Sequence, residues 1–84
     1  MNIAYQTSFL RQYKKLTKEL QDEAKEKIEI FKKDQNCSTL KVHKLKGPMK
    51  KMYSFSVNYS YRIVFEIINK ETVFLEIGNH DLYK

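Results

Sequence analysis

Four side chains in this 84-residue sequence have the chemical types needed to cleave a phosphodiester; they are His43, Arg62, His80 and Tyr83. Attack of an RNA 2′-hydroxyl on the adjacent phosphate needs a base, an acid for the leaving 5′-oxygen and a cation for the crowded phosphate. Histidine suits both proton roles because imidazole changes charge near neutral pH. Arginine binds phosphate oxygens with its planar fork, and tyrosine can stack on a splayed base. This chemistry requires no metal or other cofactor.

Each of these four residues also has an explanation that involves no chemistry. A lone histidine is more often a surface or hydrogen-bonded residue than a catalyst. Arg62 can pair with Glu76 across a sheet, and Tyr83 can close the edge of the core. The interpretation as a site therefore depends on the elements that position these residues.

A basic segment surrounds His43 and Arg62. The formal net charge of the chain is +6. Six basic residues and no acidic residue lie between Gln35 and Phe65, and the other ten basic residues balance the ten acidic residues. This segment therefore accounts for the whole net charge. Solvated lysines explain most charge runs, but a local excess without acids favours a polyanion, because neutralised phosphates release counterions. We expect four lysines of this segment to hold the RNA backbone without reading sequence. They are Lys44, Lys46, Lys50 and Lys51.

Composition limits the class of protein. The length and hydrophobic content predict one small domain over residues 1–84 with a single core. The single cysteine, Cys37, excludes an intramolecular disulfide and a multi-cysteine metal site. No apolar stretch has membrane-spanning length, and the N-terminal MNIAYQTSFLRQ lacks the apolar core of a signal peptide. We therefore expect a cytoplasmic protein.

The first half of the chain predicts a short strand and helices. Residues 3–6 form a strand candidate, followed by Thr7 or Ser8 as a helix N-cap. Apolar residues then recur every three or four positions from Phe9 to Phe31, which is typical of one face of a helix. A break near Thr17 would give a helical hairpin over about residues 8–16 and 18–34. One long helix is the alternative.

The second half predicts an antiparallel meander. Strands are expected over residues 53–58, 61–68 and 72–77, joined by short turns. Alternation places Tyr61, Ile63 and Phe65 on the apolar face, and Val73, Leu75 and Ile77 on that face of the last strand. The polar face carries Ser54, Ser56, Asn58 and Arg62. The predicted class is α+β, with about four antiparallel strands and two helices. The N-terminal strand is expected beside the meander, and the helical hairpin is expected to pack on the apolar face of the sheet.

Three segments in this order resemble the RelE/ParE superfamily of toxins from bacterial toxin–antitoxin pairs. They are HKLKG, YRIVFEI and VFLEIGNHDLY. The resemblance implies a RelE-like fold and a metal-independent endoribonuclease that cleaves messenger RNA, positioned in the ribosomal A site. It also implies a cognate antitoxin, which we expect to be acidic and partly disordered because the chain is small and basic.

The resemblance also implies roles for the four candidate residues. His43 and His80 stand at positions with acid–base roles in the messenger-RNA-cleaving members. Arg62 matches the arginine that acts on the scissile phosphate, and Tyr83 falls near the terminal aromatic. Because Gly78 lets the chain turn, His80 and Tyr83 can approach Arg62. We expect His80 to be the general acid and His43 the general base, which predicts a bell-shaped dependence of cleavage on pH.

Differences from the ribonuclease members leave a second hypothesis open. Lysines, a histidine and an acidic residue of those members are replaced here by Tyr53, Phe55, Ser56 and Ser60. ParE-like members of the same superfamily act on DNA gyrase and lack the ribonuclease residues, so fold alone does not define activity. The alternative is a non-catalytic ParE-like toxin that binds gyrase, or an inactive homologue.

Overall fold

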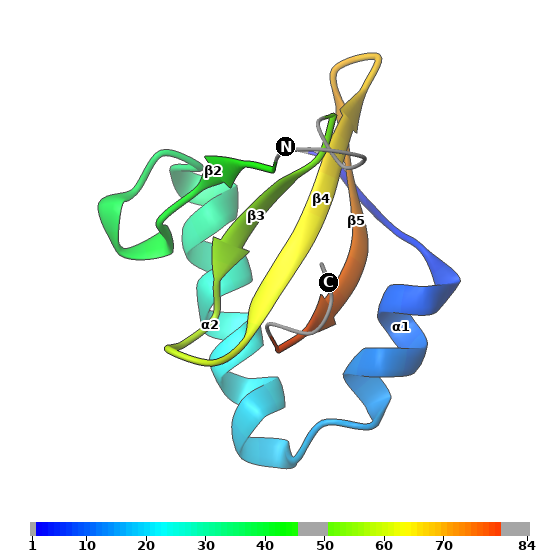
Figure 1. Ribbon diagram of the computed structural model, residues 1–84, viewed down its shortest axis with the longest axis vertical. Helices are drawn as coiled ribbons and strands as arrows, with labels where there is room; N and C mark the ends of the chain where they lie inside the picture. Colours follow the sequence, from blue (N-terminus) through cyan, green and yellow to red (C-terminus); the bar gives the residue numbers. More distant parts are fainter. Residues whose placement is uncertain (1, 46–50, 80–84) are drawn as a thin grey trace.

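The computed structural model of this protein describes residues 2–45 and 51–79. Figure 1 shows α2 running along the sheet behind β3, with α1 beside β5. The elements in chain order are β1 (Ile3–Tyr5), α1 (Thr7–Lys14), α2 (Lys18–Lys33), the 3-10 helix η1 (Ser38–Leu40), β2 (His43–Lys44), β3 (Tyr53–Ser56), β4 (Arg62–Ile68) and β5 (Glu71–Gly78). The fold class is α+β, as predicted.

The predicted helical hairpin is confirmed, and a single long helix is excluded, because α1 ends at Lys14 and α2 begins at Lys18. Thr17 is the N-cap of α2: its side-chain oxygen accepts a hydrogen bond from the Leu20 N–H at 3.2 Å. The cap satisfies one N–H group that has no partner within the helix. None of the helices in the described residues is long and apolar enough to span a membrane.

The start of α1 differs from the prediction. Its N-cap is Gln6 rather than Thr7 or Ser8, and the Gln6 side chain makes no capping bond. The Ser8 hydroxyl instead donates to the Leu75 carbonyl at 2.7 Å. Gln12 acts similarly, since its Oε1 accepts from the Ile77 N–H at 2.9 Å. Two α1 side chains thus satisfy the β5 backbone beyond the last residue that pairs with β1.

The sheet has five strands in the order β1-β5-β4-β3-β2. The N-terminal strand lies beside the meander, as expected, but it pairs in parallel with β5 rather than antiparallel. A parallel neighbour needs a long crossover connection, and the helical hairpin lies within that connection. The additional strand, β2, pairs antiparallel with β3 over only two residues, which is too short for alternation to reveal.

A β-bulge interrupts the pairing of β4 with β5. Val64 lies opposite Glu76, whereas the next residue, Phe65, lies opposite Phe74. Leu75 is therefore an extra residue on β5, and the alternation of side chains changes phase there.

The bulge makes part of the prediction for β5 wrong. Thr72, Phe74 and Ile77 are buried, whereas Val73 and Leu75 are only partly buried. Strict alternation predicted Val73 and Leu75 to be in the core. The bulge shifts the strand by one residue, and such a shift exchanges the two faces of a strand.

The core lies between the helices and one face of the sheet, and Phe31 of α2 is at its centre. The Phe31 ring stacks on Phe55 with centroids 4.8 Å apart and meets Phe65 and Phe74 edge-on at 5.1 and 5.6 Å. All four rings are at most 2 % exposed. Ile63 and Phe65 face this core and Tyr61 packs against it, as predicted. The opposite face of the sheet carries Ser54, Ser56 and Arg62, together with the buried Val64.

Candidate functional site

Three neighbouring strands bring His43 and Arg62 onto the same face of the sheet. His43 of β2 lies opposite Ser54 of β3, and Arg62 of β4 lies opposite Ser56 of β3. Directly opposed residues point to the same face, as do residues two apart on one strand. Ser54 and Ser56 therefore lie between the predicted histidine and the predicted arginine. At the usual rise of a strand, the Cα atoms of these two serines are about 6.6 Å apart. We call this face, defined by these four residues, the site face.

His43 is exposed to solvent, and its ring is held by a buried serine. Its Nδ1 lies 3.3 Å from the Oγ of Ser54, a residue that is fully buried. If Nδ1–H donates to Ser54, Nε2 carries a lone pair and can accept a proton; if Ser54 donates, Nε2 carries the proton. The serine therefore contacts one ring nitrogen, and among the described residues the other nitrogen has no hydrogen-bond partner.

Arg62 is half-buried at the first residue of β4, and its Nη1 donates to the Oγ of Ser56 at 2.7 Å. The alternative pairing with Glu76 does not form, because Gly78 lies opposite Arg62 and Glu76 lies opposite Val64. Within residues 2–45 and 51–79 the ion-paired side chains are Lys32 and Glu29, not Arg62. A guanidinium has five N–H donors, so most of them remain available for phosphate oxygens.

A pocket of about 430 Å³ opens beside Arg62. Two further cations line it, Lys27 from α2 and Lys41 after η1, together with the hydroxyl groups of Thr39 and Ser56. No carboxylate is among its described lining residues. We call it the Arg62 pocket, and its positive charge suits a phosphate.

The sequence prediction assigned no role to either lysine of this pocket. Lys27 lies in a helix where acids and bases balance, so its charge gave no signal. Lys41 belongs to the basic segment, but only its place in the same pocket as Ser56 of β3 and Arg62 of β4 distinguishes it from the other lysines there.

The remaining predicted residues divide into two groups. Lys44 and Lys51 are exposed, and Lys44 lies opposite Tyr53, so it points to the face away from His43. The other four predicted residues, Lys46, Lys50, His80 and Tyr83, lie outside the described residues.

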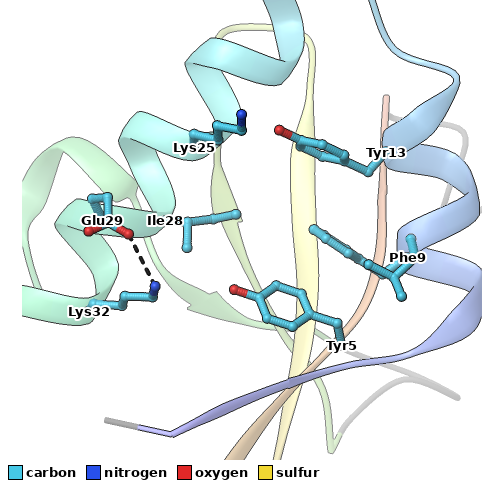
Figure 2. A pocket seen from close by; sticks show the side chains of 8 residues that line it. Tyr5, Phe9, Tyr13, Lys25, Ile28, Glu29 and Lys32 are labelled. Atoms are coloured by element: carbon cyan, nitrogen blue, oxygen red, sulfur yellow. Dashed lines mark hydrogen bonds and ion pairs between the residues drawn. The ribbon is translucent and has the colours of Figure 1, made fainter.

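A second pocket lies on the far side of the core, between α1 and α2. Figure 2 shows Tyr5, Phe9 and Tyr13 facing Ile28 across it. At its rim, Lys32 Nζ donates to Glu29 Oε2 at 3.1 Å, and this bond and the carboxylate charge raise the pKa of Lys32 above 10.5. Its walls are mainly apolar rings and aliphatic carbon, so this pocket fits a phosphate poorly.

Comparison with known proteins defines the class. The ParE-like toxin domain family model matches residues 18–84, so the chain belongs to this family. The protein is thus a toxin of the RelE/ParE superfamily from a toxin–antitoxin system. No curated protein sequence matches the chain.

Solved structures share the fold. YafQ from E. coli strain BL21(DE3) superposes with a TM-score of 0.82 at 17% identity, covering 99% of this chain and 98% of its own. A YoeB/ParE toxin from Agrobacterium tumefaciens superposes with a TM-score of 0.79 at 16% identity, covering 95% of this chain and 99% of its own. A chain of the YoeB–YefM toxin–antitoxin complex from Staphylococcus aureus superposes with a TM-score of 0.74 at 19% identity, covering 95% of this chain and 97% of its own. At these identities the likeness concerns the fold.

Proposed function

We propose that this toxin is a metal-independent endoribonuclease that cleaves messenger RNA in the cytoplasm, at the ribosome, and thereby stops translation. The observation that carries the proposal is the site face. It combines an exposed histidine oriented by Ser54 with an arginine that has a serine, and no carboxylate, as its described partner. These are a proton-transfer group and a phosphate-binding group on one rigid surface.

The reaction uses the RNA's own 2′-hydroxyl. His43 Nε2 takes the 2′-hydroxyl proton while Nδ1–H donates to Ser54 Oγ. The 2′-oxygen attacks phosphorus, and Arg62 donates to the phosphate oxygens on which negative charge accumulates. The P–O5′ bond then breaks, and His80 gives its proton to the leaving oxygen. The products are a 2′,3′-cyclic phosphate and a free 5′-hydroxyl.

A second candidate function is favoured by the name of the matching family model, ParE-like. Such a toxin would bind DNA gyrase without cutting RNA. A short pulse of expression separates the two functions. Loss of protein synthesis with new transcript 5′ ends supports the ribonuclease, whereas intact transcripts with a DNA-damage response support the gyrase toxin.

The proton roles of the two histidines have their own test. One histidine must be neutral and the other charged, so cleavage should rise and then fall with pH. We expect His80→Ala to lose more activity than His43→Ala, because the leaving 5′-oxygen depends on the acid. A truncation that removes residues 79–84 should abolish cleavage and keep the fold. Cleavage at the parental rate by the truncated chain would refute the role of His80 and Tyr83.

We further propose an acidic, partly disordered antitoxin as partner. The toxin carries a net charge of +6, so an acidic segment gains electrostatic complementarity as it orders on binding. The S. aureus YoeB–YefM complex, whose toxin shares this fold, supports an antitoxin as the partner. Co-expression with the neighbouring reading frame should restore growth. A harmless toxin, with no neighbouring product that binds it, would contradict the proposal.

A further inference from the structure

Tyr59 is the most exposed large hydrophobic side chain of the described residues, at 95 % exposure. It lies in the turn between β3 and β4 and lines the Arg62 pocket. The core gains nothing from a ring in this position. An exposed aromatic ring beside a cationic pocket is the arrangement on which single-stranded bases stack.

The turn that carries Tyr59 is held by hydrogen bonds around Asn58. Asn58 Oδ1 accepts from the N–H groups of Ser60 and Tyr61 at 2.9 and 2.8 Å. Asn58 Nδ2 donates to Glu23 Oε1 on α2 at 3.2 Å, which ties the turn to the helix. The backbone of the turn is thus already held in place, so stacking of a base on Tyr59 needs to order only the side chain.

Lys41 supplies a cation from an unusual backbone conformation. Its φ of 51° and ψ of 50° lie in the left-handed region, which residues with a Cβ seldom adopt because the Cβ approaches the following carbonyl oxygen. Glycine would adopt this conformation without strain. A lysine here, together with Lys27 across the pocket, places positive charge beside Tyr59 and Arg62.

We propose that Tyr59, Lys27 and Lys41 form a binding subsite for the nucleotide adjacent to the one whose phosphate Arg62 holds. Tyr59 stacks on the base, and the two lysines neutralise the next phosphate. The subsite takes single-stranded RNA without strong sequence preference, because every base has a face to stack. This inference rests on the proposed ribonuclease function.

The chain contains no tryptophan, so Tyr59→Trp creates a single fluorescent reporter in the subsite. The probe is a single-stranded oligoribonucleotide with 2′-O-methyl groups, which cannot undergo 2′-hydroxyl attack. Its addition should quench the tryptophan fluorescence and leave Kd close to the parental value. Ile68→Trp is the matched control, because Ile68 is also exposed but lies at the opposite end of β4. We expect no quenching there.

Loss of the ring and of the charges gives independent readouts. Tyr59→Ala should weaken binding of the same oligonucleotide about tenfold, because stacking on one base contributes on that scale. Lys27→Ala and Lys41→Gly should each weaken binding and lower the slope of log K against log salt by about 0.7. Lys33 is an exposed lysine at the end of α2, so Lys33→Ala should leave the affinity and the salt slope nearly unchanged.

Failure of the subsite is distinguishable from failure of the function. If the parental protein binds the oligonucleotide and cuts messenger RNA in a cell-free translation reaction, but Tyr59→Ala binds as well as the parent, the subsite is wrong and the ribonuclease stands. Equal quenching of the Tyr59→Trp and Ile68→Trp variants would also overturn the subsite. If the parental protein neither binds nor cuts RNA, the proposed function and the subsite fail together.

Discussion

At the scale of single residues, Arg62 is the side chain whose chemical and structural roles separate most clearly. It donates one hydrogen bond to Ser56 and makes no contribution to the aromatic core. We expect Arg62→Ala to lower cleavage about a hundredfold, or roughly 3 kcal/mol of transition-state stabilisation. The lost bond contributes about 1 kcal/mol, so Tm should fall by no more than about 8 °C.

The control for Arg62→Ala is Arg11→Ala, which removes the same charge from an exposed position on α1. Arg11→Ala should change neither rate nor Tm appreciably. Arg62→Lys should recover only part of the activity, because lysine keeps the charge but lacks the planar fork. Unfolding of Arg62→Ala would show that Arg62 is structural, and a parental rate would remove it from the mechanism.

Ser54 is proposed as a positioning residue that acts through His43. Ser54→Ala removes the hydroxyl near His43 Nδ1, so no hydrogen bond with this serine selects the tautomer of the ring. We expect cleavage to fall several-fold, because the serine hydroxyl no longer holds the imidazole in one orientation and tautomer. Ser54→Thr, which retains a hydroxyl, should recover part of the rate. A Ser54→Thr variant that is as slow as Ser54→Ala would indicate a packing effect alone.

At the scale of elements, the hairpin depends on a helix start at Lys18. Thr17→Ala removes the side-chain acceptor from the first turn of α2 and should lower the free energy of unfolding by about 1 kcal/mol. Thr7→Ala is the matched control, since Thr7 is exposed and follows the N-cap of α1, so its loss should have a smaller effect. Urea unfolding of both variants measures the difference. Equal free energies would show that the Thr17 cap does not stabilise α2.

At the scale of the whole molecule, four aromatic rings join α2 to three strands. Phe31→Ala leaves a cavity among Phe55, Phe65 and Phe74 and should cost about 3 to 5 kcal/mol. A chain of this length has a total stability of about 4 to 13 kcal/mol, so the variant should lose a large share of it and melt well below the parent. Phe31→Leu, which keeps most of the volume, should remain folded. Circular dichroism melts of the two variants test this, and parental melting of Phe31→Ala would contradict it.

Features that depend on local periodicity could be predicted from the amino-acid sequence. The apolar spacing from Phe9 to Phe31 and the cap at Thr17 gave the helical hairpin, because helix faces and caps involve residues only three or four positions apart. Alternation in β4 likewise placed Ile63 and Phe65 in the core. Arg62 was assigned to the polar face on the same basis.

Features that join distant segments could not be predicted in this way. The parallel pairing of β1 and the bulge at Leu75 depend on how strands align, and local periodicity says nothing about that alignment. The same holds for the candidate site, where Ser54 holds His43, Ser56 holds Arg62, and Lys27 of α2 joins Arg62 in one pocket. Each of these pairings needs a particular strand register or helix packing, because hydrogen bonds form only over about 3 Å.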